Sequence, residues 1–451
     1  MRGLLNESAA RAIAYLENND QRKVGPDPEA VRALHSLDVP LQVERTDPHE
    51  VIKTLDEQCS PATIFSTGGR FFGFVIGGSL PVTLAANWLA GAWDQNTGLY
   101  TITPATAHIE QVALSWLINL FGLPPGSGGA FVTGATVANL CGLAAGRHVV
   151  LNRAGWDVEA DGLFGAPPIT VIIGEEAHPV IFKALGLLGL GRKRVVLIPT
   201  DEQGRMRAND LPAISGPTIV CLQAGNVNTG AFDPFDPIID HVHAAGGWVH
   251  VDGAFGLWAA ATPSLAHLCS GVAQADSLAT DAHKYLNVPY DSGLAFVRQP
   301  DALRAAMAIT ADYLPTESTE RNPSDYTPEL SRRARGVEVW AALKYLGKKG
   351  IAELIEGTCR HARRFADELS AAGYEILNDV VLNQVLVSFG DSRTTELIIE
   401  EIQKDGTCWM GGTKWHGHTA MRISVSSWAT TDEDVEMSLE AILRAASKNP
   451  H

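Results

Sequence analysis

The sequence contains few of the features that mark secreted, metal-binding or membrane proteins. Its six cysteines lie far apart and form no CxxC pair, so neither a disulfide framework nor a metal site is expected. No run of about eighteen apolar residues occurs, and residues 1–20 carry Asn, Glu and Ser where a signal peptide requires an apolar core. We therefore predict a cytoplasmic protein that neither spans nor binds a membrane.

An excess of basic residues is also absent. The chain has 35 Lys and Arg against 51 Asp and Glu, which gives a formal net charge of −16, and no long basic block interrupts this acidity. Nucleic acids and anionic lipid surfaces are therefore poor candidates for partners. An anionic ligand would need a local pocket that is rich in hydrogen-bond donors.

Hydrophobic residues make up 45% of the 451 residues, which is enough for more than one core. Short β-branched runs alternate with helical stretches in the middle of the chain, as in a mainly parallel sheet that helices cover on both faces. These runs are residues 130–133, 169–174, 194–199, 218–223, 248–253 and 293–298. We predict a helical arm (1–78), a large α/β domain (79–348) and a small α+β domain (349–451).

Ligands of open α/β sheets bind at the carboxyl ends of the strands, so the residues that follow each strand are the candidates for a site. The first run leads into Gly134, Ala135 and Thr136, which open a helix of small residues. The N–H groups and positive dipole end of such a helix can hold a phosphate. A plain helix start capped by Thr136 would explain the same residues equally well.

Three further strand ends carry polar side chains. His178 follows one strand and could lie flat on an aromatic ring, although an isolated His is more often a helix cap. Asp252 ends an apolar strand, where a carboxylate needs a cationic partner, although an Asp that caps the following turn is about as good an explanation. Ala254 leaves room for a flat ring. Lys284 lies between two strand ends, where a sheltered amine can act as a nucleophile, whereas a lone Lys more often lies in a surface loop.

The HVDGA element at 250–254 and the DAHK element at 281–284 together resemble the group II pyridoxal-phosphate-dependent amino acid decarboxylases, a family that includes aromatic amino acid, glutamate and tyrosine decarboxylases. The resemblance extends from about residue 69 into the C-terminal region. It implies an aminotransferase type I-like fold, a pyridoxal 5'-phosphate cofactor, an amino acid substrate and a homodimer with active sites at the subunit interface.

The same resemblance implies individual roles. Lys284 would carry the cofactor as a Schiff base, Asp252 would pair with the ring nitrogen, and His178 would stack on the ring. The cofactor-binding set implied in this way also includes Gly134, Ala135, Thr136, Ala254, Asp281 and His283.

The segment 320–340 resembles the mobile catalytic loop of this family, in which a Tyr returns a proton after carbon dioxide leaves. Tyr326 stands at the matching place, and related aldehyde synthases have Phe there, so a Tyr favours simple decarboxylation. An exposed loop aromatic is the alternative interpretation of Tyr326. Arg335 could anchor this loop or bind a carboxylate.

Two earlier segments, 68–81 and 93–110, resemble the substrate-pocket elements of the family, the second of them contributed by the neighbouring subunit. The implied lining residues mix apolar with polar groups and leave the substrate open: Phe74, Val75, Gly77, Asn96 and Gly98.

Some positions depart from the family pattern. Asp281 stands where many members have Asn, as in archaeal-type tyrosine decarboxylases and sphingosine-phosphate lyases; Val137 replaces a frequent Glu, and Val227 a frequent Thr. The DxHK form of the lysine motif keeps a carbon–carbon lyase or aldolase open as an alternative. A catalytically silent pyridoxal-phosphate-binding protein is an alternative of another class, which intact Lys284, Asp252 and His178 oppose. A dinucleotide-binding fold is disfavoured, because no GxGxxG follows the first strand.

Overall fold

The computed structural model describes residues 1–17, 22–309 and 320–449, and every structural statement below concerns these residues. They form two compact units: Met1–Ile76 with Arg364–Leu377 and Leu386–His451, and Gly77–Arg363 with Asn378–Val385. The N-terminal residues join the C-terminal ones because their backbones pair: Val24 N–H donates to Gly406 O at 2.9 Å and Phe72 N–H to Trp409 O at 2.8 Å. This grouping differs from the three-part division that the sequence suggests.

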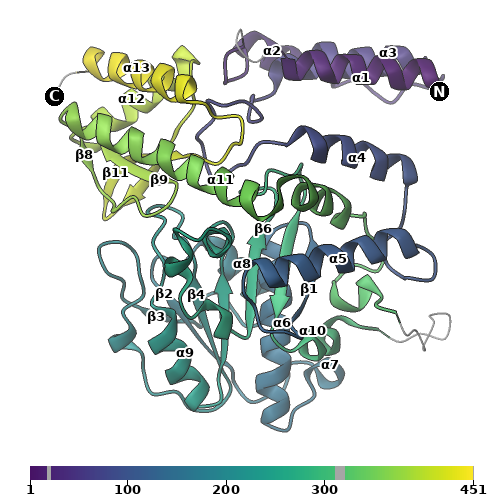
Figure 1. Cartoon of the computed structure of the whole chain (residues 1–451), viewed down its shortest axis with the longest axis vertical. Helices are drawn as coiled ribbons and strands as arrows, with labels where there is room; N and C mark the ends of the chain where they lie inside the picture. Colours follow the sequence, from purple (N-terminus) through teal and green to yellow (C-terminus); the bar gives the residue numbers. More distant parts are fainter. Residues whose placement is uncertain (18–21, 310–319, 450–451) are drawn as a thin grey trace. The chain divides into compact units, whose positions relative to one another are not determined.

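The larger unit is built on a seven-stranded sheet in the order β1-β7-β6-β5-β4-β2-β3 (Figure 1). Strands β6, β5, β4, β2 and β3 run parallel, whereas β7 is antiparallel to both of its neighbours. The strands are β1 (Gly128–Val132), β2 (Thr170–Gly174), β3 (Val196–Ile198), β4 (Thr218–Gln223), β5 (Trp248–Asp252), β6 (Ser277–Asp281) and β7 (Gly293–Val297). The predicted α/β fold with a mainly parallel sheet is confirmed, and each predicted run is a strand.

The sequence reasoning missed β6. Its residues Ser277–Asp281 read SLATD, which is short and ends in polar side chains, so no apolar pattern marks it. All five residues are nevertheless buried.

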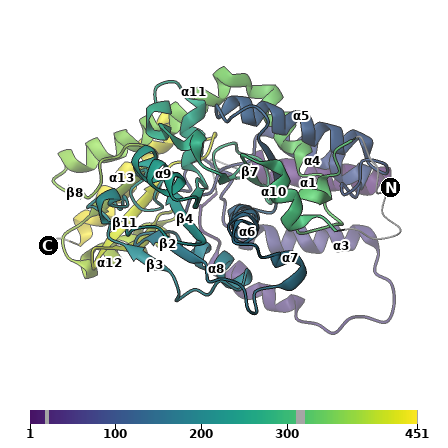
Figure 2. The same cartoon turned by 90° about the horizontal axis from the view of Figure 1, so that it is seen from below.

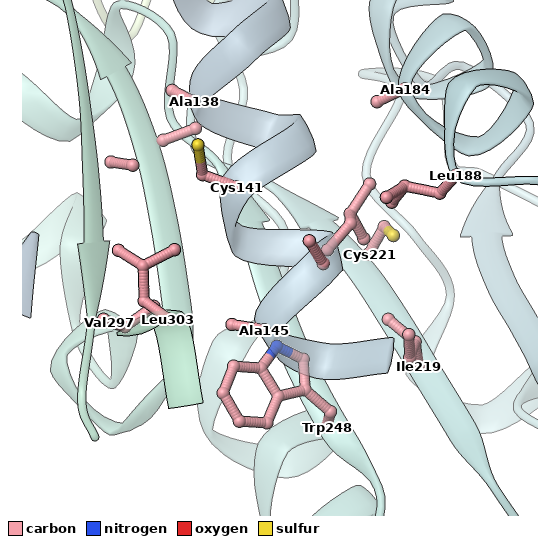
Figure 3. Close-up of a cluster of buried hydrophobic side chains, with 14 of the residues drawn as sticks. Ala138, Cys141, Ala145, Ala184, Leu188, Ile219, Cys221, Trp248, Val297 and Leu303 are labelled. Atoms are coloured by element: carbon pink, nitrogen blue, oxygen red, sulfur yellow. The ribbon is translucent and has the colours of Figure 1, made fainter. Parts of the chain in front are cut away.

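Helix α6 (Ala135–Arg153) packs closely on this sheet and appears nearly end-on in Figure 2. A side-chain carbon on Gly142 would lie 2.7 Å from the His250 ring, and one on Gly146 would lie 2.7 Å from Trp248, so both glycines permit the contact. Figure 3 shows Ala138, Cys141 and Ala145 of α6 beside Trp248 and Cys221 of the sheet in this core.

The larger unit contains further α-helices. They are α4 (Pro81–Trp93), α5 (Pro104–Leu120), α7 (Val158–Asp161), α8 (Pro179–Leu187), α9 (Phe235–Ala244), α10 (Pro300–Met307) and the first part of α11 (Gly336–Ala371), which breaks at Gly347. Helix α9 has Pro234 at its N-cap and Pro237 in its first turn, and Gly246 follows its C-cap Ala245.

The smaller unit combines helices with a four-stranded sheet in the order β10-β11-β9-β8. Its strands are β8 (Glu375–Ile376), β9 (Gln384–Ser388), β10 (Gly411–Trp415) and β11 (His418–Ser424). Its helices are α1 (Arg2–Glu17), α2 (Pro28–Ala33), α3 (Pro48–Thr54), α12 (Ser392–Asp405) and α13 (Asp432–Lys448). The predicted small α+β arrangement is present here.

Within the described ranges, no helix combines the length and the apolar character needed to cross a bilayer.

Candidate active site

Lys284 lies just beyond the end of β6, next to the start of α6. The Asp281 Oδ2 atom is 3.1 Å from Lys284 Nζ, and its Oδ1 atom accepts the backbone N–H of Ala135 at 2.6 Å. The Lys284 side chain is 20% exposed and that of Asp281 only 3%. The structure thus joins the DAHK element to the small-residue turn that the sequence suggested as a phosphate cradle.

The start of α6 has no side-chain cap of its own. The N-cap position is Gly134, so the alternative in which Thr136 caps the helix is wrong; Thr136 lies in the first turn. A side-chain carbon on Gly134 would lie 3.3 Å from the His283 ring, and one on Gly293 would lie 2.4 Å from the Gly134 Cα atom. Two glycines therefore let the His283 segment approach the helix start.

His283 is fixed by contacts on several sides. Its Nδ1 atom accepts the Ser292 backbone N–H at 3.1 Å, which places the hydrogen of the neutral ring on Nε2, 3.5 Å from Asp281 Oδ2. The ring stacks on Tyr290 with centroids 4.2 Å apart. Burial lowers the pKa of His283, so the ring is neutral at pH 7 and its Nε2–H can donate to an anion.

Asp252 ends β5, beside β6 in the sheet. Its Oδ1 atom accepts the Ala254 N–H at 3.1 Å. Burial raises the pKa of Asp252 to about 6, although the charge of Lys284 and the Ala254 hydrogen bond act in the opposite direction. The carboxylate is therefore ionised at pH 7 but needs a cationic or hydrogen-bonding partner.

A buried polar group behind Asp252 was not found from the sequence. His250 Nε2 is 2.7 Å from Asn139 Oδ1, and His250 Nδ1 is 2.8 Å from Ser277 Oγ, which also accepts the Trp248 Nε1–H at 2.9 Å. The signal that could have revealed it is His250 itself, a polar residue on the same face of an apolar strand as Asp252.

His178 is the N-cap of α8. Its Nδ1 atom accepts the Val180 N–H at 3.2 Å, and the side chain is exposed at the carboxyl end of β2. The capping role considered from the sequence is confirmed. Stacking on a cofactor ring stays a prediction.

Gly77 supports the Lys284 turn from the side. Its N–H donates to His283 O at 3.3 Å, and a side-chain carbon there would lie 1.9 Å from Lys284 O, so only glycine fits. Phe74 and Val75 belong to the other unit, in which the Phe74 ring lies 6.0 Å from that of Trp409. Their place in a substrate pocket stays a prediction.

Asn96 and Gly98 contact the segment predicted to form the catalytic loop. Asn96 Oδ1 accepts the Arg332 N–H at 3.0 Å, and Gly98 O accepts the Ser324 N–H at 3.0 Å. The Arg332 guanidinium is fully buried and donates to Glu110 Oε2 at 2.7 Å. In this conformation both residues anchor the segment, and their pocket role stays a prediction.

Tyr326 packs against the core of the larger unit beside α10. The Arg321 guanidinium lies 4.3 Å from its ring centroid, and the neighbouring Asp325 pairs with Arg304 of α10 at 3.5 Å. None of these contacts, among the described residues, involves Lys284. The role of Tyr326 as proton donor therefore stays a prediction.

Arg335 holds the loop next to His283. Its Nε atom donates to Asp291 Oδ1 at 2.8 Å. Burial would raise the pKa of Asp291, but the hydrogen bond and charge of Arg335 outweigh it and lower that pKa. The two roles considered for Arg335, anchoring the predicted catalytic loop and binding a carboxylate, stay predictions.

Comparison with known proteins adds a family match. The model of the pyridoxal-dependent decarboxylase conserved domain matches residues 28–390. Tryptophan decarboxylase 1 of Oryza sativa subsp. japonica is 25% identical over 437 residues, 88% of this chain and 84% of the relative. The acidic amino acid decarboxylase GADL1 of Mus musculus is 28% identical, over 78% of this chain and 65% of the relative. The crystal structure of Oryza sativa TDC with PLP and tryptamine superposes with a TM-score of 0.92 at 21% identity, covering 99% of this chain and 97% of that one.

Proposed function

This chain belongs to the pyridoxal-dependent decarboxylase family, and from that premise we propose that it converts an L-amino acid to its amine and carbon dioxide at Lys284. The enzyme is a carboxy-lyase whose cofactor is pyridoxal 5'-phosphate. The observation that carries the proposal for the site is the contact of Lys284 Nζ with Asp281, which also binds the first N–H of α6.

The residues around Lys284 fit this cofactor. A phosphate needs donors, and the first turn of α6, Thr136 and the neutral His283 supply them beside Gly134, where a side chain would fill the cradle. A pyridine ring needs an anionic partner for its nitrogen, and Asp252 is a buried carboxylate at the neighbouring strand end. Ala254 follows with a side chain too small to block a flat ring.

Each residue then has a task. The Lys284 amine would hold the cofactor covalently. Asp252 would keep the ring nitrogen protonated, and the exposed His178 ring would stack on the cofactor ring. When bound, the cofactor supplies an electron sink for the electron pair that remains after the carboxylate leaves.

Tyr326 is the proposed donor of the proton that replaces the carboxylate. The resemblance of segment 320–340 to a mobile loop supports this role, whereas the stacking of Arg321 on the ring supports a role in anchoring the segment. The carbon–carbon lyase and the catalytically silent protein receive no support from the related proteins described above.

One surface feature supports a homodimer. Helix α4 is apolar, yet Trp88, Leu89 and Trp93 are at least 44% exposed, and only Thr83 and Ala90 of the helix are buried. Exposed apolar surface of this kind marks protein–protein contacts. The cytoplasmic location stays a prediction from the sequence.

The test is carbon dioxide release by the purified protein with pyridoxal phosphate, across L-amino acids with aromatic, acidic and aliphatic side chains. The proposal expects release from one class together with its amine. The absence of release from every class, with the cofactor bound covalently, would contradict it.

A further inference from the structure

A file of buried polar side chains runs between α6 and the sheet toward Asp252. It starts at Trp248 and continues through Ser277, His250 and Asn139, each at most 1% exposed. The heavy-atom distances along it are 2.9, 2.8 and 2.7 Å. Burying polar groups of this kind lowers the stability of the fold unless they are hydrogen-bonded, so a row of four such groups needs a structural or functional reason.

The chemistry of the groups and the lengths of the contacts together favour one direction of the hydrogen bonds. The Trp248 Nε1–H can only donate, so Ser277 Oγ accepts it and turns its own hydrogen to His250 Nδ1 at 2.8 Å rather than to Gly142 O at 3.4 Å. The His250 hydrogen therefore resides on Nε2 and is donated to Asn139 Oδ1.

Because Asn139 Oδ1 accepts from His250, the Asn139 Nδ2–H group remains available to donate to Asp252. The Nδ2 atom is buried and meets no acceptor with full hydrogen-bond geometry among the described residues, yet the amide is close enough to Asp252 to lower the pKa of that carboxyl. A carboxylate accepts and does not donate, so it favours the same orientation of the amide.

Protonation of His250 cannot reverse the direction of these hydrogen bonds near neutral pH. Burial lowers its pKa to about 3, and its two ring nitrogens bond Ser277 and Asn139. The hydrogen bonds therefore keep one direction at neutral pH.

We propose that Trp248, Ser277, His250 and Asn139 form a one-directional hydrogen-bond relay that aims an N–H donor at Asp252 and so orients this carboxylate toward the cofactor's ring nitrogen. The inference rests on the proposed function, because it assigns positioning residues to the same site. These residues act through Asp252 and touch neither substrate nor cofactor in the proposal.

The test compares two substitutions of His250 in the cofactor-loaded enzyme. His250→Leu breaks the relay, whereas His250→Gln can donate its amide N–H to Asn139 and accept from Ser277. Thr218→Val is the matched control, since it removes an equally buried hydroxyl whose partner among the described residues is Gly216 O. The readouts are the nitrogen-15 chemical shift of labelled pyridoxal phosphate, kcat and KM.

We expect His250→Leu to move the ring-nitrogen signal toward the unprotonated form. We also expect it to lower kcat by on the order of 10-fold to 100-fold, the usual size for removing an outer supporting contact, with little change in KM. His250→Gln should keep the ring-nitrogen signal and kcat near those of the unsubstituted enzyme, and Thr218→Val should change neither the signal nor kcat. If His250→Leu does not fold, Ser277→Ala removes the preceding donor and should move the signal in the same direction.

A wild-type nitrogen signal and kcat in folded His250→Leu or Ser277→Ala would overturn the relay. A folded His250→Gln enzyme with the same change in nitrogen signal and kcat as His250→Leu would also overturn the relay, because the direction of the hydrogen bonds would then not matter. An unsubstituted enzyme that binds the cofactor without releasing carbon dioxide would refute the proposed function, while the nitrogen signal would still decide the relay.

Discussion

The Asp281 carboxylate contacts Lys284 Nζ at 3.1 Å with one oxygen and the backbone N–H of Ala135 at 2.6 Å with the other. One buried carboxylate thereby links the proposed nucleophile to the first turn of α6. The same turn is the proposed site of the cofactor's phosphate, so a negative side chain stands where a second anion is expected to bind.

Asp281→Asn should tighten the binding of pyridoxal phosphate several-fold, because the phosphate would no longer meet a like charge in a buried setting. Pyridoxal, which lacks the phosphate, is the control ligand and should gain much less. Both affinities can be measured by absorbance titration. Weaker binding of pyridoxal phosphate to the variant would mean that the carboxylate helps to hold the cofactor.

Lys284→Ala should abolish turnover and the absorbance of the covalently held cofactor together, because no other amine is proposed to attach it. Lys344→Ala, at an exposed position of α11, is the control and should change neither. A fully active Lys284→Ala enzyme would remove this lysine from the mechanism.

Tyr326→Phe tests the proton donor. If the phenol donates, the variant should bind the cofactor normally but stall or yield aldehyde in place of amine, as product analysis can show. The ring remains for Arg321 to stack on, so the stability of the segment should change little. Unchanged amine formation would leave Tyr326 with an anchoring role alone.

The free energy of unfolding of Asp252→Asn, relative to that of the unsubstituted protein, should be higher at pH 7 than at pH 4. The folded-state pKa of Asp252 is raised from 3.8 to about 6, so its proton is bound more tightly in the folded state and stability is lost as the pH rises between these values. The loss reaches about 3 kcal/mol at most, and Asn does not incur it. Denaturant unfolding of the cofactor-free proteins at pH 4 and pH 7 measures the difference, and equal differences at the two values would contradict the prediction.

Trp88→Glu should weaken the proposed homodimer, because it places a charge on the exposed apolar surface of α4. Light scattering after gel filtration gives the mass of the unsubstituted protein and of the variant. Phe164→Glu, at a position that is also exposed but outside α4, serves as control. A monomeric unsubstituted protein would contradict the dimer itself.

The sequence by itself determined the class of fold and the identity of the chemical groups. Runs such as 218–223 and 248–253 became strands because their apolar, β-branched residues suit a sheet that is covered on both faces. Asp252 and Lys284 attracted attention because a carboxylate and an amine are costly beside apolar strands, which is a local property of the chain.

Only the tertiary structure decided which of these groups meet. The strand order β1-β7-β6-β5 brings Asp281 to the start of α6, although Ala135 is 146 positions earlier, and it brings His250 to Asn139, 111 positions earlier. Residue patterns indicate local preferences, whereas such contacts depend on the order in which distant strands pair. Residues Ser277–Asp281 likewise form a strand because β5 and β7 pair with them on both sides. Their own residue pattern does not predict a strand.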